Sequence, residues 1–147
     1  MGDFKIWLEA TQSQRISSVQ EAQALSKSVG LDASGVEFDL IERALASRLP
    51  VIYDSAFPLA SIVKTPPGDK NKLLQMMGAF AQKLGVEPPK SLDQAQALKL
   101  RGPDFKKMTP PIIVQKSAGG LRVLDGVSRT TAAKLLRVWE LRAFVIG

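Results

Sequence analysis

The fold is decided by the C-terminal stretch IIVQKSAGGLRVLDGVSRTTAAKLLRVWELRAFVI, residues 112–146. Two apolar runs, residues 112–115 and 121–124, flank a Ser-Ala-Gly-Gly sequence, which predicts two strands joined in a hairpin. The period then changes, and we expect a helix over about residues 128–137. Residues 141–146 are typical of a final strand. A strand–strand–helix–strand unit therefore closes this sequence.

Upstream of this unit, the sequence predicts several helices. A Ser followed three residues later by Glu or Gln forms a capping box, and the pattern recurs at Ser18/Glu21, Ser34/Glu37 and Ser91/Gln94. Gly30 is expected to end the first of these helices, and Pro50 to stop the second. Asp3 and Asp69 are expected to begin two more helices, the second with an apolar stripe at Leu73, Met77, Phe80 and Leu84.

Between the helices, two short strands are expected on either side of Pro58, over residues 51–53 and 59–63. A Thr-Pro-Pro-Gly turn follows at residues 65–68. Residues 99–111 are expected to form a basic loop.

Composition limits the possible functions of the chain. Its 147 residues are 45% hydrophobic and 23% charged, which is ordinary for a folded globular protein. Cysteine and histidine are absent from the sequence, so structural zinc, thiol chemistry and a histidine base are excluded, and no metal ligands are assigned. No apolar run approaches the roughly 18 residues of a membrane span. We therefore expect a cytoplasmic protein with no membrane partner.

The positive charge is concentrated in the last third of the chain. Residues 1–98 carry 10 Lys and Arg against 11 Asp and Glu, whereas residues 99–147 carry 10 against 3. Such a basic segment favours an anionic partner, either a nucleotide or DNA. The basic loop supplies the candidate nucleic-acid contacts Lys99, Arg101, Lys106 and Lys107. A solvated surface without a partner is the alternative.

The turn at residues 125–131 is the candidate phosphate site. Ser128 is expected to cap the helix, so that Arg129, Thr130 and Thr131 form its first turn. Unpaired N–H groups at a helix start attract anions, Gly126 lets the backbone approach a ligand closely, and Arg129 suits phosphate oxygens. The alternative is a purely structural turn in which Asp125 pairs with Arg129.

Residues 108–147 resemble the ParB/sulfiredoxin superfamily. The resemblance rests on Pro-Pro-Ile-Ile-Val, on Leu-Arg-Val-Leu-Asp-Gly-Val-Ser-Arg with its Ala-rich helix, and on Leu-Arg-Ala-Phe-Val-Ile. The sequence departs from the family motifs, and of the GERRxR partition motif it keeps only the first Gly and one Arg, at Gly126 and Arg129. Val127 replaces the sulfiredoxin cysteine, and Val127 and Ser128 replace the histidines of the DGHHR motif. Sulfinic acid reduction is thereby excluded, and catalysis that needs the histidines is in doubt.

This resemblance implies an α+β fold, with a ParB/sulfiredoxin-like small mixed sheet and flanking helices over residues 51–147. Residues 1–50 would form an N-terminal helical extension. The resemblance also implies a nucleotide near Lys64, close to Asp69 and Lys70, and near the turn of Gly126, Val127, Ser128 and Arg129. The cofactor would be a nucleoside triphosphate with Mg²⁺.

Three functional hypotheses follow. The first is a nucleotide- or nucleic-acid-binding ParB-like accessory protein, encoded by a phage or other mobile element. The second is an enzyme, a Mg²⁺-dependent ParB-like nuclease or small-molecule phosphotransferase, with Asp125 as the candidate catalytic residue. The third is a non-catalytic interaction module that contacts a protein partner through residues 1–50. Trp139, just past the helix, is interpreted as a packing residue, with base stacking as the alternative.

Overall fold

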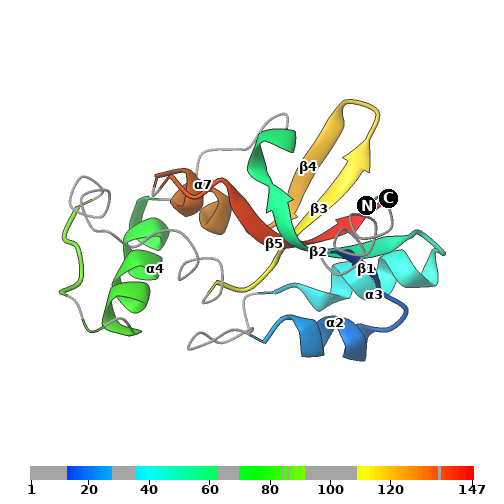
Figure 1. The fold of residues 1–147 in the computed structure, drawn as a ribbon, viewed down its shortest axis with the longest axis horizontal. Helices are drawn as coiled ribbons and strands as arrows, with labels where there is room; N and C mark the ends of the chain where they lie inside the picture. Colours follow the sequence, from blue (N-terminus) through cyan, green and yellow to red (C-terminus); the bar gives the residue numbers. More distant parts are fainter. Residues whose placement is uncertain are drawn as a thin grey trace, which may run out of the picture.

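A mixed sheet of five strands forms the centre of the part of the chain that the structure describes (Figure 1). The structure is a computed structural model that describes residues 13–27, 36–62, 70–83, 85, 87–91, 109–135 and 137–147. The strands are β1 (Ser13–Arg15), β2 (Val51–Pro58), β3 (Ile112–Ser117), β4 (Gly120–Asp125) and β5 (Glu140–Ile146). Their order is β1-β2-β5-β3-β4, and neighbours are antiparallel except β3 and β5, which are parallel.

Helices cover both faces of this sheet. They are α2 (Val19–Leu25), α3 (Phe38–Ala46), α4 (Lys70–Lys83) and α7 (Val127–Leu135), and a 3-10 turn, η2, spans Leu59–Ser61. A mixed sheet with flanking helices confirms the predicted α+β class. The finer ParB/sulfiredoxin-like assignment stays a prediction.

Successive residues of β3 enter two different cores, because side chains alternate across a strand. Ile112 and Val114 pack with Leu73 and Met77 of α4 and with Ala132 and Ala133 of α7. Ile113 packs instead with Ala22 of α2, with Ile41 and Ala44 of α3, and with Phe144 and Ile146 of β5. Burial on both faces explains why β3 begins with a continuous apolar run rather than an alternating one.

The predicted hairpin and final strand are confirmed. β3 and β4 pair antiparallel from Ser117↔Gly120 inward, with Ala118 and Gly119 between them, and β5 closes the unit. The stripe expected on α4 is confirmed at Leu73 and Met77, both buried. Asp3, Ser34, Asp69, the side chain of Phe80, Leu84 and the loop at residues 99–108 lie outside the described residues.

The two strands expected around Pro58 are wrong in detail. β2 runs without a break to Pro58, residues 59–61 form η2, and Ile62 makes an isolated parallel bridge with Leu121. Proline is tolerated at the end of β2 because, among the described residues, β1 pairs with Ile52, Tyr53 and Asp54 and does not reach Pro58. At Pro58 the outer edge of β2 is therefore not required to donate a ladder hydrogen bond.

The helix expected to end at Gly30 ends earlier, at Leu25. Ser18 caps its start as predicted, because the Ser18 hydroxyl accepts a hydrogen bond from the Glu21 N–H at 3.2 Å. At the other end, the guanidinium of Arg142 on β5 donates to the carbonyls of Leu25 (3.1 Å) and Lys27 (3.2 Å). Because the Leu25 carbonyl would accept from residue 29 in a longer helix, Arg142 competes with continuation of α2.

Residues 13–27 and 36–50 share a core with the rest of the sheet. β1 pairs with β2, and Ile16, Ala22 and Ile41 belong to the same buried cluster as Phe144. Arg142 adds a polar connection between the two parts, because it donates to the carbonyls of Leu25 and Lys27 and also to the Thr109 carbonyl at 2.7 Å. The division into an extension at residues 1–50 and a domain at residues 51–147 stays a prediction, and β1 is a strand within that extension.

Candidate functional site

The side chain of Asp125, at the end of β4, joins three elements. One carboxylate oxygen, Oδ2, accepts hydrogen bonds from the Glu37 N–H at 2.9 Å and from Nη2 of Arg129 at 3.2 Å. Glu37 is the N-cap of α3, and Arg129 lies in the first turn of α7. A negative charge is favourable at a helix start, because the unpaired N–H groups there carry partial positive charge. Asp125 therefore stabilises the start of α3.

Arg129 is directed into the protein rather than toward solvent. The side chains of Arg129 and Asp125 are 10% and 12% exposed, and Nη2 of Arg129 also donates to the Pro111 carbonyl at 3.2 Å. Burial lowers the pKa of the Arg129 guanidinium below its ordinary value, and the Asp125 and Glu37 carboxylates oppose that effect. This is the ion pair that the structural interpretation of the turn predicts.

Most other polar groups of the turn also have partners inside α7. The first hydrogen bond of α7 is accepted by the carbonyl of Gly126 and not by that of Ser128, because the Thr130 N–H donates to Gly126 at 2.9 Å. The hydroxyls of Thr130 and Thr131 each donate to the carbonyl four residues back, both at 2.9 Å. The predicted cap at Ser128 is therefore wrong by two residues, because the helix begins at Val127.

Gly126 has a structural reason of its own. Its φ is +103°, and a Cβ built there would lie 2.5 Å from Cγ2 of Ile112. The residue is therefore required for the turn to pass beneath β3, with or without a ligand. Ser128 is different, because its half-buried hydroxyl has no hydrogen-bond partner among the described residues. Of the predicted phosphate contacts in the turn, Ser128 keeps a hydroxyl that a ligand could use.

Lys64 and the basic-loop residues Lys99, Arg101, Lys106 and Lys107 lie outside the described residues. Their assignment to a phosphate or nucleic-acid site stays a prediction. Within the described ranges, no group of three or more acidic side chains lies together as a metal site would require.

The structure exposes one residue that the sequence interpretation assigned to packing. Trp139, between α7 and β5, is 60% exposed, so its interpretation as a packing residue is wrong. Two exposed cations, Lys134 and Arg137, lie five and two residues before it in the chain. The sequence carries no clear signal for this exposure, because Trp139 and Glu140 are both exposed between the buried residues Val138 and Leu141.

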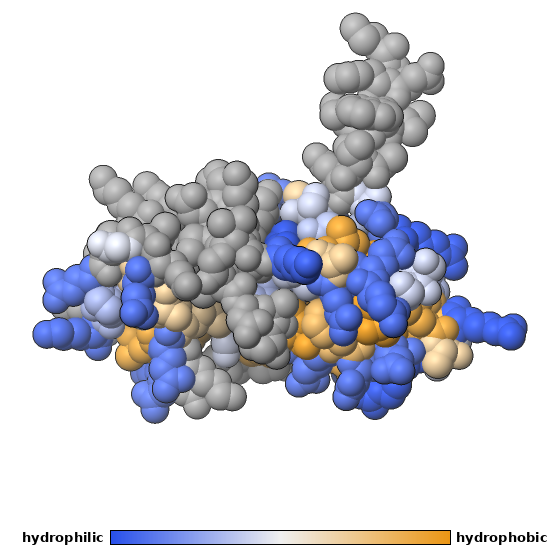
Figure 2. All heavy atoms as spheres, turned by 90° about the horizontal axis from the view of Figure 1, so that it is seen from below, coloured by the Kyte–Doolittle hydropathy of each residue, from blue (hydrophilic) through white to orange (hydrophobic). Residues whose placement is uncertain are grey.

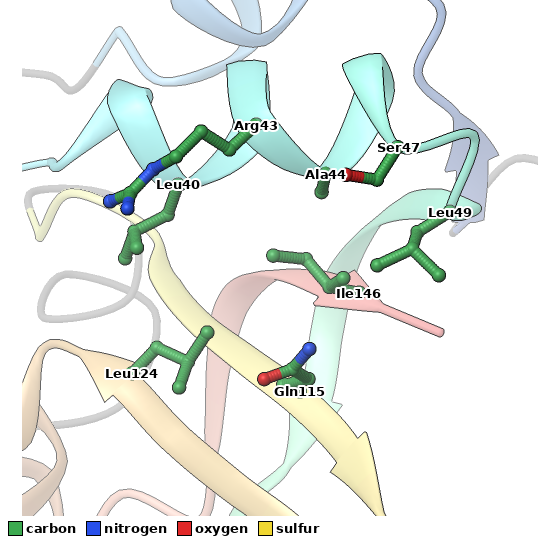
Figure 3. Close-up of a pocket in the computed structure, with 8 residues that line it drawn as sticks. All are labelled: Leu40, Arg43, Ala44, Ser47, Leu49, Gln115, Leu124 and Ile146. Atoms are coloured by element: carbon green, nitrogen blue, oxygen red, sulfur yellow. The ribbon is translucent and has the colours of Figure 1, made fainter.

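A second feature is an open pocket of about 220 Å³ beneath α3 (Figure 3). Leu40, Arg43 and Ala44 of α3 and its C-cap Ser47 line it from one side, and Leu49, Gln115, Leu124 and Ile146 complete it. The volume is below the roughly 300–1,000 Å³ of sites for drug-sized ligands. Viewed from the side of α2 and α3, apolar surface lies among hydrophilic side chains over these helices (Figure 2).

Comparisons with known proteins do not extend these observations. The chain matches no protein-family model, and no curated protein or solved structure is significantly similar to it. The likeness to the ParB/sulfiredoxin superfamily therefore rests on the motif and on the order of the elements. Among the described helices, none has the length and apolar character needed to cross a bilayer.

Proposed function

We propose that the protein binds nucleic acid through exposed cations of its C-terminal unit, residues 109–147. The observation that carries this proposal is the sign of the exposed charge. The described residues of this unit include one exposed acid, Glu140. They include four exposed cations, Lys116, Arg122, Lys134 and Arg137. Nucleic acids present closely spaced phosphates, and a surface that neutralises them gains affinity by releasing counterions.

The opposite side of the sheet has a different charge pattern. Along α3 and its N-cap, the exposed acids Glu37, Asp39 and Glu42 outnumber the exposed cation Arg43. A polyanion would be repelled by much of that surface. The contact surface is therefore assigned to the strands and helix end of the C-terminal unit, and not to α3.

Two pairs of arginines provide a matched test. Arg122 and Arg15 both lie on edge strands, and Arg137 and Arg48 both follow a helix with φ of +59°. We expect Arg122→Glu with Arg137→Glu to weaken binding of a labelled oligonucleotide and to reduce its salt dependence by about one unit of log–log slope per lost contact. Arg15→Glu with Arg48→Glu removes the same charge and is expected to leave both quantities close to wild type. Equal losses in the two variants would contradict the proposal.

A nucleotide at the α7 turn is the second candidate, and Ser128 favours it. Within the described part of the chain its hydroxyl has no hydrogen-bond partner and can donate to a phosphate, whereas the Thr131 hydroxyl donates to the Val127 carbonyl. Saturable binding of ATP or CTP, with or without Mg²⁺, should be weakened by Ser128→Ala and not by Thr131→Ala. The reverse result, or no binding in the wild type, would make the turn structural.

The other two hypotheses make contrasting demands on the structure. An enzyme using Asp125 as a base would have to release that carboxylate from the Glu37 N–H and from Arg129. An interaction module would instead use the pocket beneath α3. A partner protein would insert an apolar side chain into the pocket and place a neighbouring carboxylate against Arg43. Absence of thermal stabilisation by any nucleotide or oligonucleotide would favour the module.

A further inference from the structure

The backbone that carries Trp139 is held on both sides. The Val138 N–H donates to the Ala133 carbonyl at 2.7 Å, and the Trp139 carbonyl accepts from the Leu59 N–H at 2.9 Å. The next residue, Glu140, pairs with Pro58 in the sheet. The indole is therefore presented from an ordered turn, although 60% of the residue is exposed. Burying an aromatic side chain normally stabilises a protein, so folding does not explain this exposure.

Arg137 adds an exposed cation to this turn. Its φ is +59°, a left-handed conformation in which glycine avoids the steric cost of a Cβ. A positive charge at a helix C-terminus is favourable and offsets part of that cost. The side chain is exposed, so the residue places a cation beside the Trp139 turn. Lys134, whose carbonyl accepts from the Arg137 N–H at 3.1 Å, adds a second exposed cation.

We infer that Trp139 stacks on an unpaired base of single-stranded nucleic acid, while Arg137 and Lys134 contact the flanking phosphates. This inference rests on the proposed nucleic-acid function and assigns it a site and a substrate class. Single strands are favoured because an unpaired base exposes a π-face, whereas bases within a duplex are covered by their neighbours. Stacking on an aromatic side chain tolerates any base sequence.

The first test separates stacking from charge. We would measure the affinity of the wild type for a labelled oligothymidylate, an abasic strand of the same length and a duplex. The oligothymidylate should bind most tightly, and Trp139→Ala should weaken it by about tenfold, the value of one stacked base. Leu49→Ala is the control, because Leu49 is the other large apolar residue in the described part that is exposed, at 37%. It should bind like the wild type.

The second test uses the indole as its own reporter. The chain has two tryptophans, so Trp7→Phe leaves Trp139 as the remaining one. Fluorescence of that variant should be quenched by the oligothymidylate and much less by the abasic strand. Quenching that is equal for both strands would overturn the stacking assignment.

A third comparison addresses the cation. Arg137→Gly and Arg48→Gly relieve the same backbone conformation at two helix ends. Arg137→Gly should weaken the oligothymidylate complex and lower its salt slope by about 0.7, while Arg48→Gly should change neither.

The outcomes distinguish the two levels of the proposal. If the wild type binds no nucleic acid, the proposed function fails and the inference fails with it. If the wild type binds and Trp139→Ala binds equally well, the stacking site is wrong while the proposed function stands. A preference for duplex over single strands would have the same meaning.

Discussion

The Asp125 carboxylate contacts the N-cap of α3 and a side chain in the first turn of α7, and the two helices end in the same motif. They differ in whether the residue that follows this motif is buried. After α3, the N–H of Leu49 donates to the Ala44 carbonyl, and after α7 the N–H of Val138 donates to the Ala133 carbonyl. With Arg48 and Arg137 in the left-handed region, both ends are Schellman motifs. Val138 is 6% exposed, whereas Leu49 is 37% exposed at the rim of the pocket.

The difference shows that a local helix end does not determine what covers it. At α7, Val138 enters the core beside Ala133, and the next residue, Trp139, is directed outward. At α3, Leu49 remains at the surface and Pro50 leads into β2. One end therefore presents an aromatic side chain on a closed surface, and the other leaves an open pocket.

The largest expected effect comes from the carboxylate that the two helices share. Asp125→Ala would remove the carboxylate that forms an ion pair with the buried Arg129 guanidinium and that accepts from the Glu37 N–H. We expect a loss of about 3–5 kcal/mol in the free energy of unfolding, measured by urea denaturation.

Asp54→Ala is the control for this loss. Asp54 accepts one hydrogen bond, from the nearby Ala56 N–H, so its removal should cost about 1 kcal/mol. If Asp125→Ala and Asp54→Ala lowered the free energy of unfolding equally, the contacts of Asp125 with α3 and α7 would add little to stability.

The end of α2 is stabilised by hydrogen bonds from a residue far away in the sequence, Arg142 of β5. Arg142→Met keeps much of the side-chain volume but removes the donors to Leu25, Lys27 and Thr109. We expect the free energy of unfolding to fall by about 2–3 kcal/mol, because the variant leaves partly buried carbonyls without the hydrogen bonds that a charged group donated to them. Hydrogen exchange should show the loss concentrated in α2, and uniform loss across the sheet would contradict this role.

A small gain in stability should come from removing the backbone strain at Arg48 and Arg137. Arg48→Gly and Arg137→Gly each remove the left-handed strain but lose a cation at a helix end and loosen the unfolded chain. We expect a net stabilisation of about 0.5 kcal/mol for each, seen as a higher Tm. Opposite signs for the two variants would show that the ends are not equivalent.

The smallest effect is a pH dependence at the start of α2. Hydrogen bonds from the Ser17 N–H, the Ser17 hydroxyl and Gln14 lower the pKa of Glu21 below 4.5. A carboxyl whose pKa is lower in the folded state contributes stability above its unfolded pKa and loses it as the pH falls through the folded value. Stability should therefore decline below about pH 4.5 by slightly more in the wild type than in Glu21→Gln.

Local patterns predicted the parts of the fold whose causes are local. The hairpin, α7, β5 and the Ser18 cap depend on residues a few positions apart, and the structure confirms them. The end of α2 depends on Arg142, and the cap of α3 depends on Asp125, 88 residues away from Glu37. No local pattern encodes those pairs. The exposure of Trp139 likewise depends on how η2 and β5 pack.

The order of the strands has a consequence for the growing chain. β5 lies between β2 and β3 in the sheet, although it is the last of the five along the sequence (Figure 1). Until residues 140–146 have been synthesised, β1 and β2 have no sheet contact with β3 and β4. Phe57, Ile112 and Ile113 would remain without their β5 partners during that time. We therefore expect folding on the ribosome to be completed late, with apolar strands that chaperones could bind until then.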